Sequence, residues 1–164
     1  MSELRSVPCE DDVELGPLSE EVLTDLAPLA ENKGIALNCA GDALVIGSDT
    51  LLYRLVFNLV ENAIRYSRPG STVNVSICDN NSRVFLRVED QGPGIPKQYR
   101  ESIFQPFFRL DKSRSRAYGG AGLGLALVWE IAALHGGAVE VEASSENGTT
   151  MLASLPKRSA ALTE

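Results

Sequence analysis

Residues 49–67 read DTLLYRLVFNLVENAIRYS, and their apolar side chains recur every three or four positions. That spacing predicts an amphipathic helix, because residues three and four apart lie on one helical face. Ser48 precedes the helix as a candidate N-cap, and Pro69-Gly70 ends it. The stripe that we expect to be buried comprises Leu52, Leu55, Val56, Leu59, Val60, Ala63 and Ile64.

Alternating apolar and polar residues follow this helix and predict strands. Residues 72–78 and 83–89 flank the turn Asp79-Asn80-Asn81-Ser82, which is typical of a β-hairpin. The helices are long enough to cover one face of a sheet, which indicates the α+β class with two layers. Other expected elements are an extended piece at 13–15, a helix at 18–33 that Pro28 kinks or weakens, two strands at 35–39 and 43–46 around a Gly41-Asp42 turn, a helix at 123–134, and a closing hairpin of 138–143 and 149–155.

The composition indicates one globular domain that contacts neither a membrane nor a nucleic acid. The chain has 164 residues, a net charge of −7 and no apolar run near the roughly 20 residues that cross a bilayer. Its acidity argues against a nucleic-acid backbone as the main partner. The three cysteines, Cys9, Cys39 and Cys78, lack metal-ligand spacing, and we expect reduced thiols in a reducing compartment.

Polar residues on the helix at 49–67 form a first candidate site. At 100° per residue, Asn58, Asn62 and Arg65 fall within about 60° of one another, away from the centre of the apolar stripe. Neutral amide oxygens suit a hard cation such as Mg²⁺, and Arg65 has the reach to bind a phosphate. Tyr66 lies where it could contact a flat base. Taken alone, the pattern is better explained by a solvated polar face.

A carboxylate followed by glycines forms a second candidate. In Asp90-Gln-Gly92-Pro-Gly94-Ile-Pro, the glycines let the backbone approach a planar ligand, and Asp90 could accept a hydrogen bond from an amine such as that of adenine. An ordinary turn at a strand end is the alternative, because Asp and Gly are common turn residues. The signal is weak by itself.

A second glycine-rich stretch precedes the predicted helix at 123–134. Alternate glycines in Gly119-Gly-Ala-Gly-Leu-Gly-Leu expose backbone N–H groups at the positive end of that helix, which favours phosphate binding. Just before it, residues 97–118 hold six bases and two acids, which indicate either a place for a polyanion or a solvated loop.

The three motifs together, in this order, resemble the ATP-binding domain shared by gyrase, heat-shock chaperone, histidine kinase and mismatch-repair proteins. In the sensor histidine kinases, the boxes named N, G1, F, G2 and G3 resemble residues 58–67, 90–96, 103–111, 120–125 and 146–150. The resemblance covers about residues 12–156. It implies the Bergerat fold, a two-layer sandwich in which a mixed sheet is covered on one face by about three helices. We expect a leader at 1–11, the ATP-binding catalytic domain at 12–157 with a lid at 97–119, and a flexible tail at 158–164.

The resemblance implies a role for each motif residue. Asn62 would ligate Mg²⁺, and Asn58 would hold the triphosphate or a metal-bound water. Arg65 would face phosphate, Tyr66 would lie beside the nucleoside, and Asp90 would accept the adenine N6 hydrogen bond. The remaining nucleotide-binding set comprises Gly92, Gly94 and Ile95 at the base, Thr149 near adenine, Arg109 and Lys112 as lid cations at the γ-phosphate, and Gly120, Gly122, Leu123, Gly124 and Leu125 in the stretch that lets the lid close.

Asn58 also separates a kinase from a hydrolase. The gyrase-like ATPases that the chain resembles have a glutamate at this position, one turn before the metal asparagine, to activate water. An amide does not take up a proton at neutral pH, so we expect phosphoryl transfer rather than fast hydrolysis. Glu61 resembles a family acid sometimes proposed as a base, and the alternative for it is a solvated helix acid. The implied catalytic residues are thus Asn58, Glu61, Arg109 and Lys112.

The resemblance implies transfer of the γ-phosphoryl group of Mg-ATP to a histidine on a separate dimerisation domain. The one histidine of this chain, His135, is followed by Gly136-Gly137 rather than by an acid and is better explained as a partly buried helix-end residue. We therefore expect a catalytic domain separated from its phosphoacceptor. Its expected partners are the dimerisation domain of a parent protein and a response regulator. Its expected location is the cytoplasmic side of a parent anchored in the inner membrane.

Two other functions stay open. A serine kinase acting on an anti-sigma antagonist would form acid-stable phosphoserine instead of acid-labile phosphohistidine. A nucleotide-sensing module would bind ATP and transfer nothing. Both differ from the histidine kinase in what a transfer assay would detect.

Overall fold

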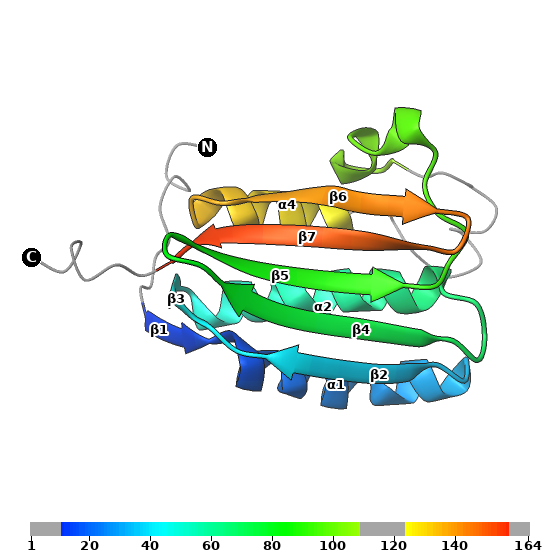
Figure 1. Cartoon of the computed structure of the whole chain (residues 1–164), viewed down its shortest axis with the longest axis horizontal. Coiled ribbons are helices and arrows are strands. Elements are labelled where there is room, and N and C mark those ends of the chain that lie inside the picture. Colours follow the sequence, from blue (N-terminus) through cyan, green and yellow to red (C-terminus); the bar gives the residue numbers. More distant parts are fainter. Residues whose placement is uncertain (1–10, 109–123, 158–164) are drawn as a thin grey trace, which may run out of the picture.

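The computed structural model describes residues 11–108 and 124–157, and these form a sheet layer against a helix layer (Figure 1). Three helices cover one face of the sheet in this part of the chain, as the sequence predicts. In chain order the elements are β1 (Asp11–Glu14), α1 (Leu15–Asn32), β2 (Ala36–Gly41), β3 (Leu44–Gly47), α2 (Asp49–Tyr66), β4 (Thr72–Asp79), β5 (Arg83–Asp90), the short 3-10 turns η2 (Lys97–Tyr99) and η3 (Ser102–Phe104), α4 (Gly124–Leu134), β6 (Ala138–Ser145) and β7 (Gly148–Pro156).

The main sheet has five strands in the order β2-β4-β5-β7-β6. Strands β2 and β4 run parallel, and the other neighbouring pairs run antiparallel, so the sheet is mixed as expected. Both predicted hairpins are confirmed as β4–β5 and β6–β7. The β5–β7 register places Asp90 opposite Thr149 at one end of the sheet. These two residues, far apart in the sequence, therefore meet at one edge.

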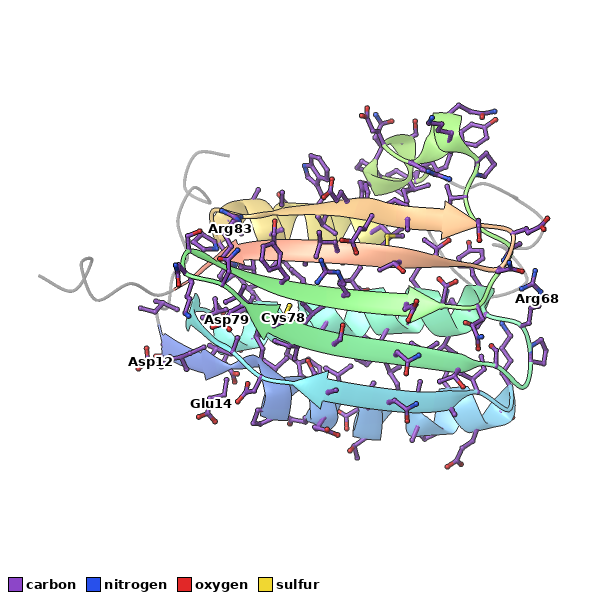
Figure 2. The ribbon with its side chains drawn as sticks, viewed as in Figure 1. Asp12, Glu14, Arg68, Cys78, Asp79 and Arg83 are labelled. Atoms are coloured by element: carbon purple, nitrogen blue, oxygen red, sulfur yellow. The ribbon has the colours of Figure 1, made fainter. Side chains whose placement is uncertain are left out.

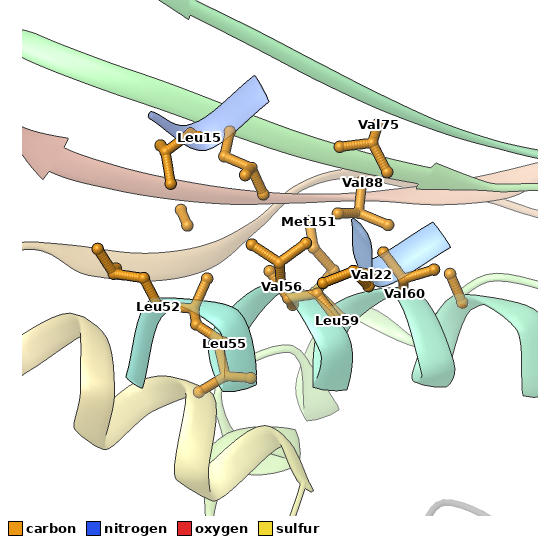
Figure 3. Close-up of a cluster of buried hydrophobic side chains, with 14 of the residues drawn as sticks. Leu15, Val22, Leu52, Leu55, Val56, Leu59, Val60, Val75, Val88 and Met151 are labelled. Carbon is orange, nitrogen blue, oxygen red and sulfur yellow. The ribbon is translucent and has the colours of Figure 1, made fainter. Parts of the chain in front are cut away.

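The core lies between α2 and the sheet. The seven residues of the predicted stripe of α2 are all buried. Figure 3 shows Val56, Leu59 and Val60 facing Val75, Val88 and Met151 from the strands, whereas Leu55 points toward α4. Strand β4 alternates as predicted, with Val73, Val75 and Ile77 buried and the residues between them exposed. Helical and strand periodicity thus bury their apolar faces against each other.

Helix α1 begins earlier than the sequence predicts. The expected helix starts at Leu18 after an extended piece at 13–15, whereas α1 starts at Leu15 and β1 ends at Glu14. The carboxylate of Asp42 explains the difference, because its Oδ1 accepts a hydrogen bond from the Gly16 N–H at 2.6 Å. A distant residue thus satisfies a donor in the first turn, which no local pattern indicates. Pro28 lies inside α1, which continues past it to Asn32.

Strands β2 and β3 occupy different sheets although one turn joins them. The sequence predicts both strands around Gly41-Asp42, and both are present. However, β2 pairs in parallel with β4, while β3 pairs antiparallel with β1 in a separate two-stranded sheet. Strand pairing depends on partners distant in sequence, so the two short runs gave no indication of this division.

The described cysteines are free thiols, and no described helix is both long and apolar enough to span a bilayer. Cys39 is half-buried on β2, and Cys78 is exposed on β4. Burial raises the pKa of the Cys39 thiol, and the charges of Glu20 and Asp42 raise it further. Cys9 lies outside the described residues.

His135 joins the end of α4 to the start of α2. It is buried, its Nδ1 lies 2.8 Å from the Ile131 carbonyl oxygen, and its Nε2 accepts a hydrogen bond from the Ser48 N–H at 3.1 Å. Both ring nitrogens therefore have backbone partners, which requires the neutral ring with its proton on Nδ1. This explains the residue structurally and leaves neither nitrogen available as a phosphoacceptor.

We expect His135→Ala to lower the free energy of unfolding by about 2–4 kcal/mol, because it leaves the Ser48 N–H without its partner and opens a cavity. Urea denaturation followed by circular dichroism measures this loss. A matched replacement of an exposed residue on the same helix, Glu130→Ala, provides the control. Equal stability of the two variants would contradict a stabilising role for His135 between α4 and the start of α2.

Candidate functional site

Asp90 ends strand β5 in a buried position, with 7% of its surface exposed. Its Oδ1 accepts hydrogen bonds from the backbone N–H groups of Gly92, at 2.9 Å, and Thr149, at 3.1 Å. Oδ2 receives no hydrogen bond from any residue that the structure describes. The side chain is therefore fixed through one oxygen and leaves the other for a ligand.

The surroundings of Asp90 make its charge costly. Burial raises the pKa of the Asp90 carboxyl, the bonds from Gly92 and Thr149 oppose this rise, and the charge of Glu89 adds to it. A buried carboxylate with an unfilled acceptor favours a ligand that donates a hydrogen bond, because the bond offsets part of the desolvation cost. An exocyclic amine is such a donor.

Two glycines shape the backbone beside Asp90. A Cβ on Gly92 would lie 2.3 Å from the Tyr66 carbonyl oxygen, so only glycine allows this loop to approach the end of α2. Gly94 has φ +89°, and a Cβ there would lie 2.2 Å from the Ser145 carbonyl oxygen. The loop after β5 thus packs against both α2 and the β6–β7 turn, and the first and second motifs meet here.

A hydroxyl network that sequence reasoning missed connects Ile95 to Thr149. The Ile95 N–H donates to Ser144 Oγ at 2.8 Å, and this oxygen lies 2.8 Å from Thr149 Oγ1. Arg100 donates to the carbonyl oxygens of Ile95, at 3.1 Å, and Ser144, at 3.2 Å. No spacing in the sequence links Ser144 or Arg100 to this region, because the contacts arise from strand register.

The polar face of α2 carries the predicted pair of asparagines. Asn58 and Asn62 are half-buried, and Asn58 Nδ2 donates to the Arg54 carbonyl oxygen at 2.7 Å. Arg65 forms an ion pair with Glu61 one turn away, at 3.3 Å, with 28% of each side chain exposed. Such a pair contributes little to stability. It places a cation beside the acid that was the candidate base.

The third motif reaches α2 through Gly124, the first residue of α4. A Cβ there would lie 3.1 Å from Asn58 Oδ1, so the helix begins directly beside that amide. Leu125 is half-buried and packs against the core. The start of α4 presents backbone N–H groups next to Asn58, which is the arrangement expected for a phosphate site.

Helix α2 carries the first motif and lies beside the other two. The start of α4 lies beside Asn58, and the loop after Asp90 lies beside Tyr66. Tyr66 lies eight positions after Asn58, a rise of about 12 Å along the helix. That interval is comparable to the length of a nucleoside triphosphate.

Part of the predicted lid is packed on the core. Ile103 and Phe104 in η3 are buried, and the Phe104 and Trp129 ring centroids lie 5.5 Å apart. Ile103 and Phe104 thus anchor this segment on the core, although no periodicity indicated them. Several predicted site residues lie outside the described part of the chain, namely Arg109, Lys112, Gly120, Gly122 and Leu123.

The donor set near α2 fits magnesium held mainly by a ligand. Within residues 11–108 and 124–157, no three His, Cys, Asp or Glu side chains come together to form a metal cage. Mg²⁺ is usually bound by one or two protein oxygens together with substrate phosphates. The half-buried amide of Asn62 supplies one oxygen of that kind.

The sheet, the helix layer and the buried carboxylate define a two-layer nucleotide-binding domain of the ATPase type. A family model described as histidine kinase-, DNA gyrase B-, and HSP90-like ATPase matches residues 47–159. The chain therefore belongs to this ATPase family, and the relatives that follow place it with the sensor histidine kinases. The expected fold and the expected family are both confirmed.

Sensor histidine kinases are similar to this chain in sequence and in structure. The sensor-like histidine kinase SenX3 of Mycobacterium tuberculosis is 38% identical over 152 residues, which cover 92% of this chain and 37% of that protein. The mycobacterial sensor histidine kinase MprB has a TM-score of 0.80 and 32% identity, covering 91% of this chain and 98% of the solved one.

Two longer solved chains were determined with a ligand or partner. Full-length ShkA in complex with AMPPNP has a TM-score of 0.79 and 26% identity, covering 96% of this chain and 33% of that chain. The histidine kinase ThkA in complex with the response regulator protein TrrA has a TM-score of 0.73 and 26% identity, covering 91% and 42%. Our chain thus spans about a third of the length of SenX3 and ShkA.

Proposed function

We propose that this domain binds Mg-ATP and transfers its γ-phosphoryl group to a histidine on a separate dimerisation domain. One observation supports the proposal: the loop after the buried Asp90 packs against the end of α2 at Tyr66, and α4 begins beside Asn58 on the same helix. The full-length ShkA structure, which contains AMPPNP, supports an adenine nucleotide as the ligand.

At the base end, Asp90 Oδ2 accepts a hydrogen bond from the adenine amine. Gly92 and Gly94 form the wall beside it, Ile95 packs on the base, and Thr149 completes the edge. Tyr66 lies beside the nucleoside, since its carbonyl group adjoins Gly92. This assignment is supported by the two backbone bonds that hold Asp90 Oδ1 and leave Oδ2 without a partner among the described residues.

At the phosphate end, Asn62 ligates Mg²⁺, and Asn58 holds the triphosphate or a metal-bound water. When bound, the metal ion neutralises charge on the phosphate oxygens. Gly124 and Leu125 contribute backbone N–H groups at the start of α4, and Arg65 faces the phosphates from α2. Arg109 and Lys112, together with Gly120, Gly122 and Leu123, complete the set in the lid. Phosphoryl transfer requires mainly such positioning and charge neutralisation.

The absence of a water-activating carboxylate at position 58 favours transfer over hydrolysis. Asn58 takes up no proton at neutral pH, and its Nδ2 is already engaged by the Arg54 carbonyl oxygen. Glu61 is a further acid on the same helix, and its carboxylate forms an ion pair with Arg65 at 3.3 Å. We therefore assign Asn58 to phosphate binding and Glu61, at most, to proton transfer from the acceptor histidine.

A dimerisation domain and a response regulator are the partners that we propose. His135 has both ring nitrogens bound to backbone groups, so the acceptor histidine must lie elsewhere. ThkA was solved in complex with the response regulator protein TrrA, which supports a regulator as the next recipient of the phosphoryl group.

Titration with ATP and magnesium, followed by a transfer assay, tests this function. We expect heat on addition of ATP to the folded chain, and acid-labile phosphate on a supplied dimerisation domain that contains the acceptor histidine. The same domain with its histidine replaced by alanine is the control. Acid-stable phosphate would identify a serine kinase instead, and binding without transfer would indicate a nucleotide sensor.

A further inference from the structure

Arg68 donates hydrogen bonds to three backbone carbonyl oxygens on two separate loops. Its guanidinium lies 3.1 Å from the oxygen of Gln91, 3.4 Å from that of Gly92 and 2.8 Å from that of Glu146. Gln91 and Gly92 follow Asp90 directly, and Glu146 lies in the β6–β7 turn shortly before Thr149. Arg68 itself comes two residues after the end of α2. It therefore connects three segments at one end of the sheet.

Arg68 binds the segments next to the two groups that fix Asp90. Gly92, in the loop after β5, and Thr149, the second residue of β7, supply the two N–H groups that hold Asp90 Oδ1. Arg68 binds carbonyl groups of that loop and of the turn that precedes β7. Gln91 is held further by Thr72, whose N–H donates to its Oε1 at 2.7 Å. Arg68 thus links the loop that holds Asp90 through Gly92 to the turn that leads into Thr149.

The chemistry of the contact favours arginine. A guanidinium has five N–H donors in a fixed plane and can bind carbonyl groups on both sides, whereas the three N–H donors of an ammonium all point from one nitrogen atom. Arg68 forms no ion pair with a described residue, so its contacts with these carbonyl groups are what order its side chain. Its charge also lies beside Gly92 at the base end, away from Asn58 and the start of α4.

We propose that Arg68 is a positioning residue for the adenine end of the site, acting through the loops around Asp90 and not through contact with the nucleotide. The proposal rests on the proposed function of Asp90 as the adenine acceptor. A positioning residue of this kind affects the affinity for the base. Its effect on Kd is therefore the same for ligands with three, two or no phosphates. An arginine that contacted phosphate would instead affect ATP more than adenosine.

Arg83 offers a matched control on the same sheet. It also donates to a backbone carbonyl group, that of Ser154 at 3.2 Å, and it begins the strand that Asp90 ends. Seven residues of strand separate the two positions, about 23 Å. Figure 2 shows Arg68 and Arg83 at opposite ends of the sheet. Arg83→Ala thus removes a similar contact far from Asp90.

The experiment compares the wild type with Arg68→Ala, Arg68→Lys and Arg83→Ala in the full chain. Calorimetric titrations with ATP, ADP and adenosine measure the Kd of each. We expect Arg68→Ala to raise all three values by the same factor, about tenfold or 1.4 kcal/mol. Arg68→Lys recovers part of this loss, because an ammonium reaches one carbonyl group. Arg83→Ala leaves all three values unchanged.

Amide hydrogen exchange measured by NMR gives a readout without nucleotide. We expect the N–H groups of Gly92 and Thr149 to exchange about tenfold faster in Arg68→Ala, while those in the centre of β5 exchange as in the wild type. Unchanged exchange rates at Gly92 and Thr149 would refute the positioning role of Arg68. A general loss of protection throughout the sheet would also overturn it, because Arg68 would then act on stability alone.

The titrations distinguish this inference from the function on which it rests. A wild type that binds none of the three ligands would refute the adenine site. The exchange measurement would still test whether Arg68 orders the backbone around Asp90. A wild type that binds ATP together with an Arg68→Ala variant of equal affinity would refute the role of Arg68 alone. A loss confined to ATP would replace positioning with direct phosphate contact.

Discussion

Asp90→Asn is expected to weaken ATP binding about a hundredfold while the domain stays folded. Asparagine retains Oδ1, which the N–H groups of Gly92 and Thr149 hold in place. Its Nδ2 then takes the position of Oδ2 and points a donor at the adenine amine, which is itself a donor. Losing a charge-assisted bond and gaining this conflict costs about 2.8 kcal/mol. Calorimetric titration with ATP measures the change, and unchanged affinity would refute the assignment of Asp90.

The same variant has a pH-dependent signature in its stability. The pKa of Asp90 is raised in the folded state, so the folded domain holds this proton more tightly than the unfolded chain does. The stability that Asp90 contributes is therefore present below its ordinary pKa and is lost as the pH rises through the raised value. Asparagine does not titrate there. We expect the variant to gain stability relative to the wild type from acidic to neutral pH, measured by urea denaturation.

Asn62→Ala is expected to reduce phosphoryl transfer about a hundredfold, because a positioned electrostatic group at the phosphates is lost. Alanine is the best helix former, so α2 stays intact and the loss is not one of folding. The defect should appear as a loss of magnesium dependence: ATP binding without magnesium stays near the wild-type value, and the gain on adding magnesium disappears.

An asparagine outside the site provides the control for Asn62. Asn74→Ala alters an exposed residue on β4 whose side chain contacts Asn38, and transfer should stay at the wild-type rate. Transfer assays over a range of magnesium concentrations measure both variants. An Asn62→Ala domain with the wild-type rate and the wild-type magnesium optimum would remove Asn62 from the metal site.

Periodicity in the sequence predicted the layers of this fold well. The stripe of α2 and the alternation of β4 and β5 each depend on residues close in sequence, and the structure buries these faces as expected. The start of α1 was predicted wrongly because the group that satisfies Gly16 comes from Asp42, in a different loop. The separation of β2 from β3 likewise depends on distant pairing partners.

Some residues of the candidate site were likewise predictable from local sequence, and others depend on distant partners. Asp90, Gly92 and Gly94 lie in a short motif whose chemistry is visible locally, and so do the asparagines of α2. Arg68, Ser144 and Arg100 have no such motif. The two arginines donate to backbone carbonyl groups and Ser144 Oγ accepts from a backbone N–H, and only the folded sheet brings these partners near. Sequence patterns reveal groups offered to a ligand more readily than the groups that hold them in place.

One rigid helix carries the contacts for both ends of the proposed ligand. Adding a single residue to α2 between Asn58 and Tyr66 would rotate one end by about 100° relative to the other and lengthen the gap by about 1.5 Å. The amides and the base wall would then no longer face the same molecule. The spacing of the two ends therefore depends on the number of residues in this segment, and a change in its length would disrupt the site even where every side chain is kept.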